Sequence, residues 1–272
     1  MNIHPNQIKQ RLAMGEIAMG AKVDLASPDI VEMVGIAGYD FVWIDCENGA
    51  IDLETAMHMM RAADATGTTP VVRIAGQSGV DIMRLLDAGA MGIIVPDVSS
   101  RAQAAAAVAS ARYRTARLPS GMRGACPRIR AGGHQVDSWT SFTEWSNENT
   151  LLWLSIESVG GVLALDEILE VPGFDAIILG PFDLSVSMGY PGQTTHPEVA
   201  RKIDQIIKKS RLKNIDVVGI VLAKDIADIG SDQQRWVDLG CRILNVVSDR
   251  RLIAVGLRDS LQAARQKPVV SR

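Results

Sequence analysis

The stretch Phe174–Ser185, FDAIILGPFDLS, joins a strand-like run directly to a turn and a carboxylate. Its first half, Phe174–Leu179, is a short apolar run with β-branched residues, which is typical of a strand buried on both faces. The run ends at Gly180-Pro181, and Asp183 follows where we expect a short helix to begin. Ligands of parallel α/β sheets bind at the carboxyl ends of the strands. Asp183 is therefore either a ligand-binding carboxylate or a helix N-cap, a position that Asp favours.

The same pattern recurs at Leu151–Glu157, LLWLSIE, another apolar run that ends in a carboxylate. Outward from these two stretches, strand-like and helix-like segments alternate along the chain. The expected strands are Ile17–Val23, Asp40–Asp45, Pro70–Ile74, Met91–Val95, Leu151–Glu157, Phe174–Leu179, Asp216–Val221 and Cys241–Val247. The expected longer helices are Pro28–Ala37, Leu53–Ala65, Val80–Ala88, Arg101–Arg112, Val159–Leu169, Pro197–Leu212, Ile226–Leu239 and Arg250–Gln266. This alternation predicts an α/β protein with a parallel (β/α)8 barrel, the TIM-barrel fold, as a single domain over residues 1–272.

An open, doubly wound sheet is the alternative fold for such an alternation. No GxGxxG motif follows the first strand, and the even number of repeats favours closure into a barrel. One long irregular insert, at about residues 113–150, interrupts the rhythm. Loops of this length inside a compact domain are usually functional, so we expect the insert to form the pocket for a second substrate.

The bulk composition limits the possible partners. The chain is 47% hydrophobic and 22% charged, with a net charge of −3, which argues against a general nucleic-acid or anionic-membrane binder. The first residues, MNIHPNQIKQRL, lack the apolar core of a signal peptide, and no apolar run approaches the roughly 20 residues that span a bilayer. We therefore expect a cytoplasmic protein with no nucleic-acid or membrane partner.

Cysteine and histidine are too dispersed to suggest a zinc site. The three cysteines form no CxxC pair, and the four histidines show no HxxxH or HxH spacing. A metal ion would therefore be held mostly by oxygen, which favours Mg²⁺ or Mn²⁺.

Active sites of such barrels form at the carboxyl ends of the strands, so the residues there are the candidates. They are Asp45, Glu47, Asn48, Arg73, Asp97, Glu157, Gly180, Asp183, Lys224 and Ser248. Glu157 and Asp183 follow neighbouring strands, and two carboxylates with the remaining positions left to water and substrate are a usual way to hold Mg²⁺. Arg73 offers a planar fork for a carboxylate, although a salt bridge closing the barrel mouth would also explain it. Together these groups suit a small 2-oxo acid, whose enolate a metal would stabilise.

These residues resemble the HpcH/HpaI family of class II aldolases, which are metal-dependent pyruvate aldolases on a (β/α)8 barrel of the phosphoenolpyruvate/pyruvate type. The resemblance covers nearly the whole chain. It is carried by FVWIDCEN (41–48), VVRI (71–74), LLDAGAMGIIVPDV (85–98), RYRTARLPSGMRG (112–124), LSIES (154–158) and GPFDLSVSMGY (180–190).

The resemblance implies a role for each matching position. Glu157 and Asp183 would bind the divalent ion, Mg²⁺ or Mn²⁺ with Co²⁺ as a further candidate. Arg73 would contact the 2-oxo acid. The resemblance also implies catalytic roles for Asp45, Glu47, Asn48 and Asp87. It implies substrate contacts for Ser155, Gly180, Pro181, Phe182 and Asp183. A homo-oligomer is also implied, a hexamer or another dimer-based assembly, with the C-terminal helix in an intersubunit contact.

Three positions depart from the family pattern. Asn48 stands where the family usually has a histidine base, and an amide cannot act as a general base near neutral pH. Ser155 replaces the usual Gln before the metal-binding Glu, and Asp97 replaces the usual Met. His134, in the Gly-rich part of the insert, is the best alternative proton carrier, whereas His58 fits packing or a surface position in its Met-rich helix. Lys224 and Asp97 are further candidates, for which a cap or a salt bridge is the favoured explanation.

Three readings of the function follow. The first is a divalent-metal-dependent carbon–carbon lyase, an aldolase or decarboxylase acting through a metal-stabilised pyruvate enolate, for which base-free decarboxylation of oxaloacetate suits Asn48. The second is a synthase that condenses an oxaloacetate or pyruvate enolate with a second carbonyl, as in citrate formation. The third is a non-catalytic relative that binds the keto acid. Retention of Glu157, Asp183 and Arg73 favours the first two.

Overall fold

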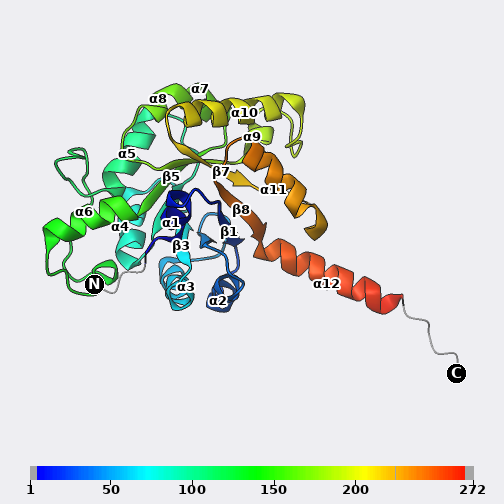
Figure 1. Cartoon of the computed structure of the whole chain (residues 1–272), viewed down its shortest axis with the longest axis horizontal. Helices are drawn as coiled ribbons and strands as arrows, with labels where there is room; N and C mark the ends of the chain where they lie inside the picture. Colours follow the sequence, from blue (N-terminus) through cyan, green and yellow to red (C-terminus); the bar gives the residue numbers. More distant parts are fainter. Residues whose placement is uncertain (1–4, 224, 267–272) are drawn as a thin grey trace.

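The computed structural model describes residues 5–223 and 225–266, and within them eight parallel strands close into a barrel in chain order (Figure 1). The strands are β1 (Ala18–Val23), β2 (Phe41–Asp45), β3 (Thr69–Arg73), β4 (Gly92–Val95), β5 (Leu151–Ile156), β6 (Ala176–Leu179), β7 (Asp216–Ile220) and β8 (Ile243–Ser248). The closed ring confirms the predicted (β/α)8 fold and excludes the open sheet.

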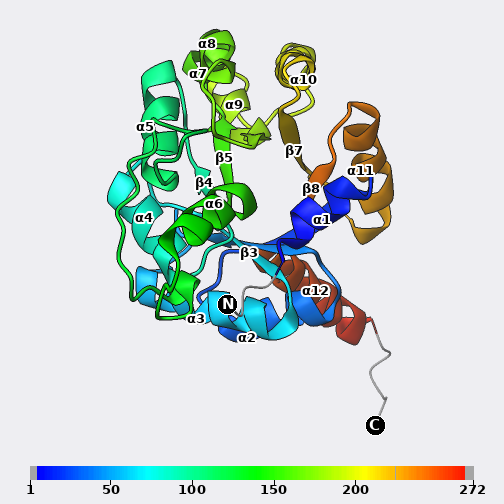
Figure 2. The ribbon, with the colours of Figure 1, turned by 60° about the vertical axis from the view of Figure 1, so that its left-hand side comes forward.

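Helices surround the barrel on its outer side (Figure 2). They are α1 (Gln7–Ala13), α2 (Pro28–Ile36), α3 (Leu53–Thr66), α4 (Gly79–Ala88), α5 (Arg101–Ala111), α6 (Trp139–Asn149), α7 (Val159–Leu163), α8 (Leu165–Leu169), α9 (Pro181–Ser187), α10 (Pro197–Leu212), α11 (Ile229–Asp238) and α12 (Asp249–Arg265). Two short 3-10 helices, Arg130–Gly132 and Ile226–Asp228, complete the set among the described residues. The sequence did not predict α1, which places Ile8 in the core inside the barrel.

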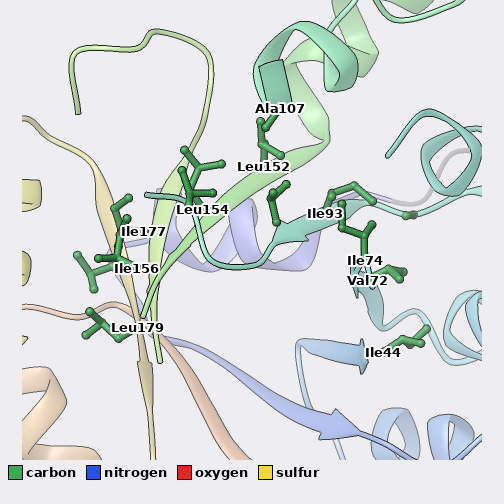
Figure 3. Packing of buried hydrophobic residues seen from close by; sticks show 14 of the residues in the cluster. Ile44, Val72, Ile74, Ile93, Ala107, Leu152, Leu154, Ile156, Ile177 and Leu179 are labelled. Atoms are coloured by element: carbon green, nitrogen blue, oxygen red, sulfur yellow. The ribbon is translucent and has the colours of Figure 1, made fainter. Parts of the chain in front are cut away.

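Strand alternation divides the core into two layers. Phe41 and Trp43 of β2 point into the barrel, where the Phe41 ring meets the edge of Trp153 at 5.6 Å between centroids. The intervening residues, Val42 and Ile44, lie between the sheet and the helices. Figure 3 shows part of this outer layer, with Leu152, Leu154, Ile156 and Ile93 among its members. Since successive side chains of a strand face opposite sides, the inward series continues to the polar residues at the barrel mouth.

The insert contains more regular structure than predicted. It includes α6 and one of the 3-10 helices, and its aromatic residues form their own small core around Phe142. Arg123 lies 4.5 Å from the ring centre of Tyr113 and donates a hydrogen bond to Asp87 of α4 at 2.7 Å. These contacts fix the insert against the outer helices of the same chain.

The last helix, α12, extends away from the barrel (Figure 1). Four of its apolar side chains are largely exposed: Leu252, Ile253, Leu257 and Leu261. Among the described helices, none is both long and apolar enough to cross a membrane.

Candidate active site

A cavity of about 260 Å³ opens at the carboxyl ends of the strands. Of the predicted site residues, it is lined by Asn48, Arg73, Ser155, Glu157, Gly180, Pro181, Phe182, Asp183 and Ser248. These residues lie at or just after the carboxyl ends of β2, β3, β5, β6 and β8, which closure of the barrel brings together. Asp45 and Glu47 adjoin this group through Arg73.

Arg73 is held between two carboxylates. Its Nε donates to Asp45 Oδ1 at 2.8 Å and its Nη2 to Asp45 Oδ2 at 2.6 Å, while Nη1 lies 2.6 Å from Glu47 Oε2. Asp45 and Arg73 are register partners on β2 and β3, which explains the side-by-side geometry. The salt-bridge explanation of Arg73 is therefore correct. Two of its five N–H groups are not used in these three contacts, so Arg73 can also bind a ligand.

The two carboxylates around Arg73 have pKa values shifted in opposite directions. Burial alone would raise the pKa of Asp45, but hydrogen bonds and charge from Arg73, together with Lys22, lower it well below its usual range. Burial raises the pKa of Glu47, against the lowering effect of Arg73, and the charges of Glu157 and Asp45 add to the increase. Asp45 is therefore an anion at neutral pH, and it orients Arg73.

Glu157 is fixed by two hydrogen bonds at the end of β5. The Ser155 hydroxyl donates to Oε2 at 2.7 Å, and the backbone N–H of Asp97 donates to Oε1 at 2.7 Å. Burial raises the pKa of Glu157, the two hydrogen bonds lower it, and the nearby charge of Asp183 raises it. A divalent cation between Glu157 and Asp183 would relieve this repulsion.

Two backbone features give Glu157 its position. Asp97 has a φ of 43°, in the left-handed region; its backbone N–H donates to Glu157, and its side chain accepts a hydrogen bond from the Ser158 hydroxyl at 2.9 Å. Gly180 lies against Glu157, because a Cβ at this position would be 2.6 Å from the Glu157 Cβ and 2.7 Å from Oε2. Asp97 therefore helps to orient Glu157 through its backbone N–H, a role that its position in the sequence did not indicate.

Lys22 is a cavity residue that the sequence analysis missed. Its Nζ lies 2.9 Å from Asp24 Oδ1 and 2.7 Å from Asp45 Oδ2, and 5.3 Å from the ring centre of Trp43. Lys22 lies within the expected first strand rather than after it. Period-two alternation from Ala18 through Gly20 would have identified it as facing the barrel interior.

Other predicted candidates lie elsewhere. Asp87 pairs with Arg123 and does not line the cavity, so its proposed site role stays a prediction. His58 contacts Arg61 on α3, and His134 lines a separate cavity near Arg130. No described insert residue lines the barrel-mouth cavity, and the expectation that the insert forms the pocket for a second substrate stays a prediction. Lys224 lies outside the described residues.

The donor set fits a metal held in part by substrate and water. The described residues contain no group of three or more His, Cys, Asp or Glu side chains arranged to enclose an ion. Two oxygen donors, Glu157 and Asp183, with an adjoining cavity match the coordination that Mg²⁺ prefers. Zinc usually takes nitrogen or sulfur ligands, which this pair does not offer.

A closed barrel with two carboxylates and an arginine at its mouth is typical of enzymes that act on small anionic substrates. A family model described as HpcH/HpaI aldolase/citrate lyase matches residues 20–247, and the chain belongs to this family of aldolase-type lyases. The 5-keto-4-deoxy-D-glucarate aldolase of Enterobacter sp. (strain 638) is 34% identical over 91% of this chain and 92% of its own. The hydroxypyruvate/pyruvate aldolase of Pseudomonas aeruginosa is 32% identical over 95% and 92%, respectively. The crystal structure of citrate synthase SbnG is 32% identical, with a TM-score of 0.83 over 95% of this chain and 97% of that one.

Proposed function

We propose that this protein is a divalent-metal-dependent lyase that breaks or forms a carbon–carbon bond next to a pyruvate unit. The observation that carries the proposal is the convergence of Glu157, Asp183 and Arg73 on one cavity. The related aldolases, whose names include pyruvate and a keto sugar acid, support a 2-oxo acid as the common substrate element.

Each residue has a physical task in this proposal. Arg73, oriented by Asp45, offers its remaining N–H groups to the substrate carboxylate. The first N–H groups of α9, at Phe182 and Asp183, have no acceptor within their own helix and face the same end of β6. A divalent ion bound by Glu157 and Asp183 would supply positive charge where the substrate oxo oxygen becomes negative.

Asn48 favours a reaction that needs no base for its first step. In oxaloacetate, the C3–C4 bond breaks, its electron pair forms the pyruvate enolate, and carbon dioxide leaves. A proton from water then adds at C3 to give pyruvate. Asn48 lines the cavity but cannot accept a proton near neutral pH, so reactions that begin with C–H or O–H deprotonation are expected to be slower.

A synthase is the second candidate. The same enolate carbon can attack a second carbonyl, whose oxygen then takes up a proton. The similarity to citrate synthase SbnG favours this alternative.

An NMR screen tests the proposal. The protein is incubated with Mg²⁺ or Mn²⁺ and with oxaloacetate or pyruvate, with and without aldehydes or a second keto acid. We expect metal-dependent loss of oxaloacetate above the rate of metal alone, and a condensation product would identify the synthase. No metal-dependent turnover of any combination would refute the proposed function.

We also propose a homo-oligomer, either a hexamer or another dimer-based assembly. The exposed Leu252, Leu257 and Leu261 of α12 support a contact between copies of the chain. The molar mass in solution, measured by light scattering, tests this point. A cytoplasmic location stays a prediction from the sequence.

A further inference from the structure

Trp43 of β2 belongs both to the inner core of the barrel and to the lining of the barrel-mouth cavity, and it is only 6% exposed. Ile94 and Ile178 share both memberships, so the three side chains form the floor of the cavity. We propose that Trp43 positions Arg73 and Lys22 and donates its indole N–H to the carboxylate of the bound 2-oxo acid. The inference rests on the proposed function and adds to it a binding residue from inside a strand.

Strand register places Trp43 between two cations. In the closed ring β2 lies between β1 and β3, and Lys22 of β1 is the register partner of Trp43. On the other side its partner is Val71 of β3, and Arg73 follows two residues later on the same face of that strand. Trp43 is therefore flanked by one cation from each neighbouring strand.

Both cations lie over the Trp43 ring. The Lys22 Nζ is 5.3 Å and the Arg73 Cζ 5.0 Å from the ring centre. The face of an indole ring attracts a cation within about 6 Å, and the attraction grows when little water remains. The side chains of Arg73 and Lys22 are 7% and 19% exposed, and Asp45 Oδ2 pairs with both. A carboxylate and an aromatic ring thus hold each cation in place before a ligand binds.

The indole N–H of Trp43 is an unused donor. Its Nε1 is buried and has no hydrogen-bond partner among the described residues. The neighbouring members of the inner core, such as Val71, Ile94 and Ile178, have hydrocarbon side chains and offer no acceptor. A buried donor without an acceptor destabilises the protein, so an acceptor from the cavity side stabilises it. The carboxylate proposed to bind Arg73 is a strong acceptor and reaches the same cavity.

Trp153 provides a matched comparison inside the same barrel. It is fully buried in the inner core, its Nε1 also lacks a described partner, and its ring meets Phe41. It is not among the described residues that line the barrel-mouth cavity. A purely structural role of a buried indole would apply to both tryptophans, whereas contact with a ligand distinguishes Trp43.

Nuclear magnetic resonance of the indole groups tests the donor directly. The ¹⁵N-labelled full-length protein is titrated with oxalate, a planar anion that resembles the pyruvate enolate, with and without Mg²⁺. Trp43→Phe and Trp153→Phe each remove one signal from the five tryptophans and so assign both resonances. We expect the Trp43 indole proton to move downfield as oxalate binds, because a hydrogen bond to an anion deshields it, and the Trp153 signal to stay near its place. An unmoved Trp43 signal in the oxalate-bound protein, or no oxalate binding at all, would overturn the inference.

Oxalate affinity, measured by calorimetry, separates the ring from its N–H. Trp43→Phe keeps a ring beneath the cations but loses the donor, so we expect affinity to fall about tenfold. Trp43→Leu loses both, and a fall of about 100-fold is expected. Trp153→Phe should bind oxalate as the native protein does. Equal affinity in the native protein and both Trp43 variants would contradict the positioning role.

The metal dependence of the same titrations distinguishes this inference from the proposed function. Oxalate affinity that is equal with and without Mg²⁺, together with oxaloacetate turnover that does not depend on metal, would contradict the metal-dependent lyase. The Trp43 resonance would still decide the inference, because Arg73 and Trp43 bind the carboxylate without the ion. A metal-dependent lyase whose Trp43 signal ignores oxalate would keep the proposed function and lose the inference.

Discussion

Arg73 and Asp45 form a two-point ion pair across neighbouring strands, with Nε–Oδ1 and Nη2–Oδ2 distances of 2.8 and 2.6 Å. Asp45 has no exposed surface, and Lys22 binds the same Oδ2 atom at 2.7 Å. One buried anion thus positions the two cations that face the cavity from β3 and β1. Asp45 and Arg73 are the last inward-facing residues of β2 and β3. The ion pair therefore both joins these two strands and positions Arg73 at the cavity.

Replacing Asp45 with Asn is expected to destabilise the protein by about 3 kcal/mol, since it leaves Arg73 and Lys22 without their shared buried partner. Urea unfolding measures the free energy of unfolding at pH 7. Asp259→Asn, in an exposed pair with Arg258, is the control and should show no resolved change. Equal stability of the native protein and the Asp45 variant would show that the pair is not a structural element.

The same variant has a defined pH dependence. Because the folded-state pKa of Asp45 is lowered, its stabilising contribution is complete above its unfolded-state pKa of about 4 and is lost as the pH falls through the folded-state value. The stability difference between the native protein and Asp45→Asn should therefore be constant near neutral pH and shrink below about pH 4. A difference that grows on acidification would contradict this assignment.

Gly180 should control the position of Glu157. In Gly180→Ala, the new Cβ would come within 2.6 Å of the Glu157 side chain and displace it. We expect Mn²⁺ affinity, followed by electron paramagnetic resonance, to fall about 10- to 100-fold. Gly230→Ala is the matched control, because a Cβ there meets no atom within 4 Å. Unchanged Mn²⁺ affinity in Gly180→Ala would argue against Glu157 as a metal ligand.

Asn48→His should restore a base at the cavity. We expect deuterium exchange into the methyl group of pyruvate, measured by NMR with Mn²⁺ or Mg²⁺ present, to rise by about 100-fold. Asn48→Gln keeps an amide and serves as the control. If both variants exchange at the native rate, the missing base does not explain the proposed preference for decarboxylation.

The cysteines should differ sharply in reactivity. Burial raises the pKa of Cys46 and of Cys241 to about 12, so at pH 8 their thiolate fraction is on the order of 10⁻⁴. Cys126 is exposed. A thiol reagent at pH 8 should therefore modify one cysteine rapidly in the native protein, and Cys126→Ser should remove this reaction. Rapid modification of Cys46 would show that the loop after β2 opens in solution.

Local sequence patterns predicted the fold because each strand and helix has its own periodicity and end signals. Asp52, for example, is a favoured N-cap residue and caps α3 by accepting a hydrogen bond from the Thr55 N–H. The strand-end rule likewise identified Arg73, Glu157 and Asp183, which the barrel brings to one cavity. Positions within a strand were missed, and Lys22 is the main example.

Long-range packing accounts for what the sequence could not show. The role of Asp97 depends on its backbone N–H contact with Glu157, 60 residues away in the chain, and no residue pattern near Asp97 encodes that contact. The placement of the insert depends on contacts such as Arg123 with Asp87, 36 residues apart in the chain. Arg251 lines the cavity from the start of α12, which Asp249 joins to the end of β1, more than 220 residues away in the chain.

The most direct measurement of the central claim is Mn²⁺ binding, together with oxaloacetate turnover, in the native protein and in Glu157→Ala and Asp183→Ala. Two carboxylates that share one ion predict that either substitution weakens Mn²⁺ binding by more than about 100-fold and abolishes metal-dependent turnover. Native Mn²⁺ affinity or undiminished turnover in either variant would contradict a metal site between Glu157 and Asp183.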